Sequence, residues 1–315
     1  MSDETSIELD PEIAAILRED AAVDLPDPTT LPIAAARAQL TAASLAWNVE
    51  LPELPVIRDL SVPGPGGAIR LRLYRPHAAG RLPAVVYLHG GGWTFGSIET
   101  HDRLMRLLAL AAEAAVIGVD YRLAPEHPFP APLEDCLAAI RRVRGHADEL
   151  AVEQGRIAVA GDSAGANLAL ASLLALRDAG EPPPKAAALF YGCYGSRLDS
   201  PSHARFGDGF YRLSSAEMGW FWGNYLGKTP AGHPLAEPLH ADLSGLPSLY
   251  VTLAAVDPLA DDTRELARRL TAAGVPHEVR EYAGTVHGFL QMSARSAAAR
   301  SALADAGRAI RGLLI

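Results

Sequence analysis

The second and third quarters of the chain, and most of its last quarter, alternate between continuous apolar segments and segments with helical periodicity. Continuous apolar runs of this length are typical of strands buried on both faces, which occur in parallel sheets covered by helices on each side. The predicted strands are 83–90, 114–121, 156–162, 186–192, 247–255 and 275–282. The predicted helices are 101–113, 132–145, 166–179, 262–273 and 294–314. Functional loops of such folds gather at the carboxyl ends of the strands.

Two parts of the chain lie outside this alternation. Residues 1–45 have helical periodicity, and the extended segments 55–62 and 69–75 follow them. Residues 196–240 contain no clear strand but are rich in aromatic rings, namely Phe206, Phe210, Tyr211, Trp220, Phe221, Trp222 and Tyr225. A long insertion between core elements is typical of a lid or binding element. Alternatively, the rings form the small core of the insertion, and different rings can serve either purpose.

The charge balance limits the partners. The formal net charge of -9 argues against a nucleic-acid partner, which needs a basic face. The apolar stretches are shorter than the roughly 20 residues of a membrane span, and the acidic start MSDETSIELDPE lacks a signal-peptide pattern. Two cysteines, Cys136 and Cys193, form no disulfide framework, and we predict free, buried thiols. We therefore expect a cytoplasmic protein without a membrane partner.

A serine stands at one junction between strand and helix. Gly161-Asp162-Ser163-Ala164-Gly165 fits the pattern G-x-S-x-G, directly after the predicted strand 156–162 and before the predicted helix 166–179. This pattern in this context is the nucleophile elbow, a strained turn that raises a serine hydroxyl above the sheet. The glycines that flank it provide the minimal side chains that the turn needs. We predict that Ser163 is a nucleophile.

A glycine-rich loop follows the first strand of the alternation, in His89-Gly90-Gly91-Gly92-Trp93. Glycines let backbone N–H groups approach a substrate closely, and such groups stabilise the oxyanion of acyl transfer. Gly90 and Gly91, together with Ala164 after the nucleophile, are the predicted donors, although the spacing leaves open which two of the three glycines donate. No G-K-[ST] follows, so the loop does not fit a phosphate-binding loop.

A serine nucleophile needs a base, and histidine is the usual one. The histidines after Ser163 are His203, His233, His240, His277 and His287. The first three lie in the aromatic insertion and the fourth lies in a predicted strand. His287 follows the end of that strand among small residues, at the edge where a base is needed. We predict that His287 is the base.

An acid that orients the imidazole is expected near the same edge. Asp257 follows the predicted strand 247–255, and the dipeptide Asp-Pro is also a common turn start. Asp261 and Asp262 begin the next predicted helix, where aspartates are expected as helix caps. We therefore predict that Asp257 is the acid and that the other two are caps.

The motifs HGGGW at 89–93, DYRLAPEHPFPA at 120–131, GDSAG at 161–165, DPLAD at 257–261 and VHGF at 286–289 stand in a fixed order. In this order the chain resembles the hormone-sensitive-lipase-like esterases, or bacterial family IV, in their GDSAG branch. The resemblance covers roughly residues 35–312. It departs at Ala260, where the family commonly has arginine.

The resemblance implies the α/β-hydrolase fold, a mostly parallel eight-stranded sheet with helices on both faces and a helical cap. It implies a catalytic triad of Ser163, Asp257 and His287, and no metal or other cofactor. It also implies a cap from the N-terminal helices and the insertion, and often a homodimer. The expected division is 1–45 as cap helices, 46–195 as the first part of the core, 196–240 as cap insertion and 241–315 as the second part of the core.

The predicted function is a serine carboxylesterase that hydrolyses short- to medium-chain esters of small molecules through an acyl-enzyme. An amidase, peptidase or lactone hydrolase would use the same triad, because the pocket selects the leaving group. A non-catalytic receptor on this fold, similar to the gibberellin receptors, lacks the histidine that this chain has at position 287. A lipase acting on insoluble lipid is a further alternative, but no surface-anchoring amphipathic segment is evident.

Overall fold

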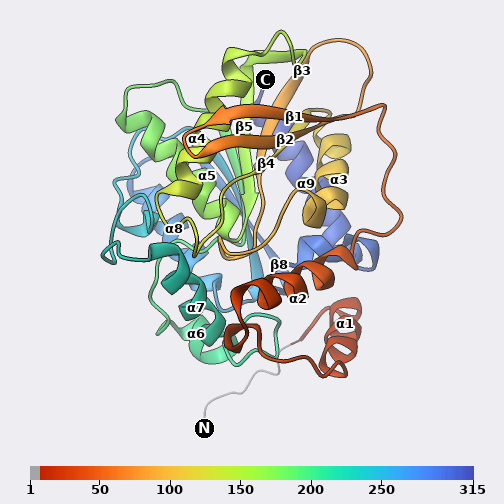
Figure 1. Cartoon of the computed structure of the whole chain (residues 1–315), viewed down its shortest axis with the longest axis vertical. Coiled ribbons are helices and arrows are strands. Elements are labelled where there is room, and N and C mark those ends of the chain that lie inside the picture. Colours follow the sequence, from red (N-terminus) through yellow and green to blue (C-terminus); the bar gives the residue numbers. More distant parts are fainter. Residues whose placement is uncertain (1–7) are drawn as a thin grey trace.

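The computed structural model describes residues 8–315, and these form one eight-stranded sheet with helices on both faces (Figure 1). The strands are β1 Val56–Gly64, β2 Gly67–Arg75, β3 Leu82–Leu88, β4 Ala115–Asp120, β5 Val152–Asp162, β6 Ala186–Phe190, β7 Ser248–Val256 and β8 His277–Val286. Their spatial order is β1-β2-β4-β3-β5-β6-β7-β8. Neighbours from β4 to β8 pair in parallel, and β2 runs antiparallel to both β1 and β4. The predicted mostly parallel α/β fold is confirmed.

Alternate residues of the central strands face two separate hydrophobic cores. Val86 and Leu88 of β3 point into one core, while Val85 and Tyr87 point into the other. The first core lies under α4 Ala131–Gly145, α5 Ala164–Asp178 and α8 Ala260–Ala272. The second lies under α3 Asp102–Ala112 and α9 Ala297–Leu313. Because both faces are buried, these strands have continuous apolar sequences.

The direction in which successive strands are added to the sheet reverses at β3. From β3 the chain crosses to β4 on one side and then returns past β3 to β5 on the other. Loops at such a switch point diverge and leave a crevice at the carboxyl ends of the strands. The loop after β3 and the turn after β5 border this crevice, and these are the two segments that carry the HGGGW and GDSAG motifs.

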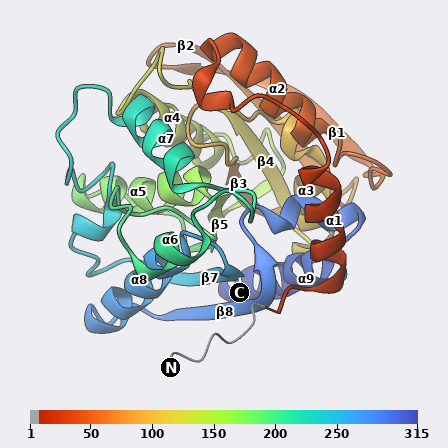
Figure 2. The same cartoon turned by 90° about the horizontal axis from the view of Figure 1, so that it is seen from below.

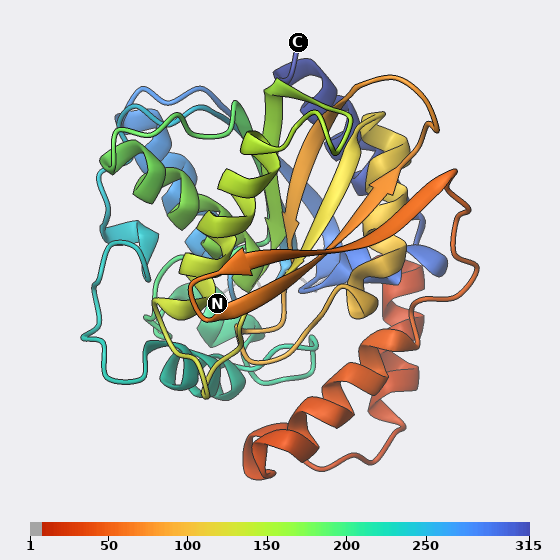
Figure 3. The ribbon, with the colours of Figure 1, turned by 45° about the horizontal axis from the view of Figure 1, so that its top comes forward.

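Two further groups of helices lie at this end of the molecule. The N-terminal helices are α1 Pro11–Ala21 and α2 Ile33–Leu45, and the segment 196–240 holds α6 Pro201–Phe206, α7 Ser215–Leu226 and the short helix η3 Pro238–His240. Figure 2 looks onto this end of the body, where both groups lie. Figure 3 shows α1 and α2 (red) projecting from it. Residues 1–7 of the predicted helical region 1–45 lie outside the described residues. No helix within residues 8–315 is long and apolar enough to cross a bilayer.

Candidate active site

Ser163 occupies the sharp turn between β5 and α5. Its φ of 54° and ψ of -119° lie in a region that side-chain-bearing residues seldom adopt. Its N–H donates to the Phe190 carbonyl oxygen at 2.9 Å, which fixes the turn to the end of β6. A Cβ on Gly165 would lie 1.9 Å from the carbonyl oxygen of Leu88. Gly165 is therefore required for two reasons. The helix α5 packs directly against β3, and the turn itself needs a minimal side chain.

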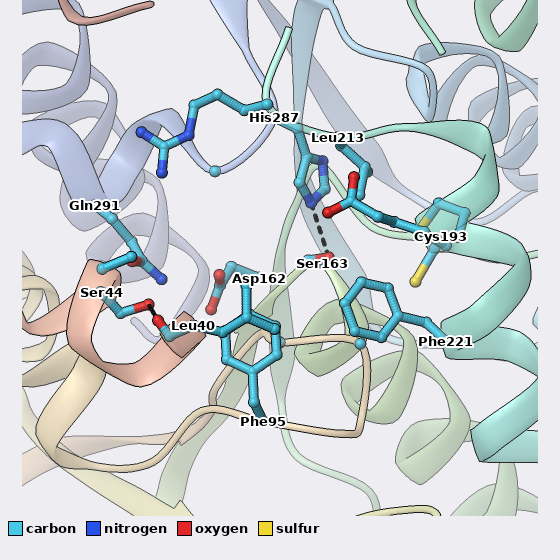
Figure 4. Close-up of a pocket in the computed structure, with 17 residues that line it drawn as sticks. Leu40, Ser44, Phe95, Asp162, Ser163, Cys193, Leu213, Phe221, His287 and Gln291 are labelled. Carbon is cyan, nitrogen blue, oxygen red and sulfur yellow. Dashed lines mark hydrogen bonds between the residues drawn. The ribbon is translucent and has the colours of Figure 1, made fainter. Parts of the chain in front are cut away.

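His287 joins Ser163 to Asp257. Its Nε2 lies 2.9 Å from the Ser163 Oγ (Figure 4). Its Nδ1 lies 2.8 Å from Asp257 Oδ2. β8 continues to Val286, so His287 is the first residue after the strand. Asp257 is 1% exposed, and its second oxygen accepts the Leu259 N–H at 2.8 Å. Asp257 therefore forms the Asp-Pro turn and also faces the imidazole of His287. The predicted role as the acid and the alternative role in turn formation are compatible.

The four other candidate histidines have different partners. The Nδ1 of His203 lies 2.8 Å from the Ser215 hydroxyl, and the Nδ1 of His277 lies 2.8 Å from the Val275 carbonyl oxygen. His233 accepts the N–H of Leu235 through its Nδ1 at 3.2 Å. His240 is half exposed and faces Glu237 at 3.9 Å. Within the described part of the chain, none of these four is joined to Ser163 by a hydrogen bond.

The expectation that Asp261 and Asp262 serve as helix caps is wrong. Asp262 Oδ2 accepts the N–H groups of Tyr194 and Gly195 at 2.6 and 3.0 Å, and Asp261 accepts the N–H of Ser202 at 2.8 Å. Both carboxylates therefore fasten the start of the insertion rather than the start of their own helix. Burial raises the pKa of Asp262 to about 7, while its two N–H donors oppose that shift.

The oxyanion-hole prediction needs one correction. The N–H of Gly90 donates to Asp162 Oδ1 at 2.9 Å, so this group is not available to a substrate. Gly91 and Gly92 line the pocket beside Ser163, and within residues 8–315 no hydrogen bond joins either N–H to an acceptor. A Cβ on Gly92 would lie 2.1 Å from the Phe221 ring. Gly91 and Gly92, with Ala164, are the donors that the geometry leaves free.

Asp162 holds the loop 89–92, called the oxyanion loop below, through a buried polar cluster. Besides the Gly90 N–H, its Oδ1 accepts the Tyr87 hydroxyl at 2.7 Å and lies 3.3 Å from the His101 Nε2. Burial tends to raise the pKa of Asp162, but the neighbouring His101 and the hydrogen bond from the Tyr87 hydroxyl outweigh burial and lower the pKa. Burial lowers the pKa of His89, in the same cluster, to about 3, so this ring is neutral. This cluster was not predicted, because only histidines after Ser163 were considered and His101 precedes the serine.

A pocket that is partly open to solvent leads to Ser163 and His287. α2 contributes Leu40, Ala43 and Ser44, and the insertion contributes Arg212, Leu213, Glu217, Met218 and Phe221. The remaining lining residues are Gly91, Gly92, Phe95, Asp162, Cys193, Gly288 and Gln291. Both helix groups that lie over the strand ends therefore form its walls.

The aromatic residues of the insertion divide between the two predicted uses. Phe221 lines the pocket. Tyr225 instead stacks on Trp93 at 4.1 Å between ring centroids, and Trp222 lies 4.5 Å from the same ring. These rings anchor α7 to the residue that follows the oxyanion loop. One segment thus supplies both a pocket wall and its own small core.

Two further features bear on the chemistry. Cys136 and Cys193 are free and buried, as predicted. Among residues 8–315, no group of three or more His, Cys, Asp or Glu side chains is arranged to hold a metal ion.

The known proteins to which this chain is similar point to one family. The family model described as "alpha/beta hydrolase fold" matches residues 85–291. The carboxylic ester hydrolase LipN of Mycobacterium tuberculosis is 41% identical over 264 residues, covering 80% of this chain and 70% of that protein. An acetyl esterase of Salmonella agona is 38% identical over 266 residues, covering 83% of this chain and 81% of that protein.

Solved structures agree with these relatives. A hyperthermophilic esterase from the archaeon Pyrobaculum calidifontis superposes with a TM-score of 0.93 at 39% identity, covering 98% of this chain and 99% of that chain. An ester hydrolase from the metagenome of Lake Arreo also superposes with a TM-score of 0.93 at 39% identity, covering 97% and 99%. The order of motifs, the fold and these relatives agree: the chain belongs to the hormone-sensitive-lipase-like esterases of the α/β-hydrolase fold.

Proposed function

We propose that the chain is a serine carboxylesterase that hydrolyses short- to medium-chain esters through an acyl-enzyme. The observation that carries this proposal is the unbroken chain of hydrogen bonds from Asp257 through His287 to Ser163, at the floor of a pocket with free backbone N–H groups. The relatives at about 40% identity are named as ester hydrolases, which supports the same reaction.

The mechanism follows from the two hydrogen bonds of the His287 ring. When the Nδ1–H of His287 donates to Asp257, its Nε2 is left to accept the proton of Ser163. Ser163 then attacks the ester carbonyl, and the oxyanion accepts hydrogen bonds from the N–H groups of Gly91, Gly92 and Ala164. His287 returns the proton to the leaving alcohol. Water activated by the same imidazole then hydrolyses the acyl-enzyme.

The preference for short acyl chains rests on the wall opposite α2. Leu213, Met218 and Phe221 are each less than 10% exposed, and they close this side with apolar surface. An acyl chain of a few carbons can bury itself there, whereas a long chain has to leave through the open side. We expect kcat/KM to be highest for short p-nitrophenyl esters and to fall at longer chains.

The experiment is the hydrolysis of p-nitrophenyl esters from acetyl to dodecanoyl by the native protein, Ser163→Ala and Ser61→Ala. Ser61 is exposed and remote from the pocket, so its variant is the matched control. We expect activity that peaks at short chains, is abolished in Ser163→Ala and is retained in the control. Hydrolysis that survives in Ser163→Ala would contradict the proposal, and inactivity on every ester would favour an amidase, peptidase or lactone hydrolase.

Two further expectations belong to the same proposal. The pair of free, buried cysteines fits a reducing compartment, and we propose a cytoplasmic location, which fractionation of the source cells would test.

A homodimer is also proposed, because β8 lies at the edge of the sheet and pairs only with β7 among the described strands. Sedimentation velocity that gave only the monomer mass would contradict the dimer.

A further inference from the structure

The pocket has an apolar side and a polar side. In Figure 4, Leu213, Cys193 and Phe221 lie on one side of Ser163, and Ser44 and Gln291 lie on the other, together with Leu40. We call this second side the polar side because it carries the hydroxyl of Ser44 and the amide of Gln291. Gln291 belongs to the 3-10 helix η4 Phe289–Ala294, which begins two residues after His287. The polar side therefore adjoins the segment that carries the base, where the leaving alcohol receives its proton.

Arg212 belongs to this polar side. Among the described residues that line the pocket, it is the only arginine or lysine. Its guanidinium carbon lies 5.7 Å from the centroid of Trp47, just after α2, and Arg295, just after η4, lies 6.0 Å from the same ring. The contact with Trp47 places Arg212 near the end of α2 that carries Ser44.

Within residues 8–315, the guanidinium of Arg212 donates one side-chain hydrogen bond. One of its five N–H donors reaches Asp20 of α1 at 3.1 Å, and the side chain is 28% exposed. Its φ of 75° is a left-handed conformation that non-glycine residues seldom adopt. A partly buried cation with donors that no acceptor among residues 8–315 occupies, in the same pocket as Ser163, is suited to bind an anion.

The carboxylates that line the pocket already have partners. Asp162 accepts the Gly90 N–H and the Tyr87 hydroxyl. Glu217 accepts the N–H and the hydroxyl of Ser214 in the capping box of α7. Each has hydrogen bonds that stabilise its charge, so neither depends on Arg212 for a partner.

We propose that Arg212 selects esters whose alcohol part carries a carboxylate, and binds that carboxylate on the polar side of the pocket. This inference rests on the proposed esterase function and names its substrate class. The acyl part would occupy the apolar side formed by Leu213, Cys193 and Phe221. Asp20 competes with the substrate carboxylate for the same guanidinium.

A matched pair of substrates isolates the charge. Both 4-acetoxybenzoate and its neutral methyl ester release acetate from a phenol, and only the first carries a carboxylate on the alcohol part. The readout is the ratio of their kcat/KM values, which removes the effects that a variant has on both substrates alike. We expect Arg212→Gln to lower this ratio by about 10-fold through the KM of the anionic ester, as for the loss of a charge-assisted hydrogen bond.

Three variants separate substrate binding from a structural role. Arg295 is the other cation on Trp47, and Arg295 does not line the pocket. Arg295→Gln should therefore leave the ratio of kcat/KM values unchanged. Arg212→Lys keeps the charge and should retain part of the preference. Asp20→Asn removes the competing carboxylate and should raise the ratio. If Arg212 only fastened α1 to the insertion, Asp20→Asn would act in the same direction as Arg212→Gln.

The outcomes distinguish this inference from the function on which it rests. Hydrolysis of the methyl ester with a ratio that does not change in Arg212→Gln would overturn the role of Arg212 alone. The same holds if Asp20→Asn and Arg212→Gln shift the ratio in one direction. If the native protein hydrolysed neither ester, the proposed esterase function itself would be contradicted.

Discussion

At the scale of single residues, Asp162 links the nucleophile turn to the oxyanion loop. It lies beside Ser163 in the chain, and its carboxylate accepts the N–H of Gly90, the first glycine of the loop. Occupying this donor leaves the next two glycines of the loop free toward the pocket. The lowered pKa keeps Asp162 ionised, which strengthens its hydrogen bonds.

Removing this carboxylate tests the link. We expect Asp162→Ala to lower kcat for p-nitrophenyl acetate by about 10- to 100-fold with little change in KM, because a misplaced oxyanion loop weakens binding of the transition state. Asp162→Asn keeps an acceptor for the Gly90 N–H and should retain more activity. Steady-state kinetics of both variants provides the check, and equal kcat values in the two would contradict a positioning role.

The residues of the reaction centre were predictable to different degrees. Ser163 and His287 could be placed from the sequence because local patterns at strand ends mark them. The assignment of Gly90 was wrong because its N–H is taken by a side chain 72 residues away. Arg212 gave no signal, since only the packing of α1 and α2 against the insertion brings it to the pocket.

At the scale of elements, the helix α2 forms a pocket wall with little burial of its own. Ala36 is its only buried residue. Arg37 fastens it by donating to the carbonyl oxygens of Thr94 and Ala124 at 2.9 and 3.1 Å and by pairing with Glu126 at 2.8 Å. Arg37 thus ties this wall to the segment just after the oxyanion loop.

Arg37→Ala should therefore loosen α2 and widen the pocket. We expect the KM for p-nitrophenyl butyrate to rise several-fold and the free energy of unfolding to fall by about 1–2 kcal/mol, because a partly buried ion pair and two hydrogen bonds are lost. Arg18→Ala, at an exposed arginine of α1, is the control. Faster limited proteolysis before α2 should accompany the change in KM, and kinetics equal to those of the control would contradict the anchoring role.

The boundaries of the strands and helices were predictable from apolar patterns, whereas the side-chain hydrogen bonds that hold these elements in place were not. The strands and helices lie within a few residues of the predicted ranges because both faces of the sheet are buried. Asp261 and Asp262 stand where caps are expected, yet they bind N–H groups about 60 residues earlier in the chain. Such contacts depend on where the insertion folds back, and a local pattern does not encode that.

At the scale of the whole molecule, the buried Asp262 should make stability depend on pH. Its pKa is raised to about 7 in the folded protein, above the ordinary value of 3.8. Between these two values the folded state binds a proton that the unfolded state does not. The contribution of Asp262 to stability is therefore present below the ordinary pKa and is lost as pH rises to about 7.

Unfolding by urea at pH 5 and pH 8 measures this dependence. We expect the native protein to lose stability on the order of a few kcal/mol from this group between the two conditions. Asp262→Asn titrates no carboxylate at this position, so its free energy of unfolding should change less over the same interval. A difference between pH 5 and pH 8 that is the same in both proteins would show that Asp262 does not carry the effect.

The most direct test of the account is to locate the nucleophile chemically. Diethyl p-nitrophenyl phosphate reacts with a serine that is activated by a histidine and leaves a stable diethylphosphoryl group. The protein is treated with this reagent, and intact-mass measurement, peptide mapping and residual esterase activity are followed together. We expect one adduct per chain, on Ser163, formed in step with the loss of activity and absent in His287→Ala. Loss of activity with Ser163 unmodified, or an adduct on another residue, would contradict it.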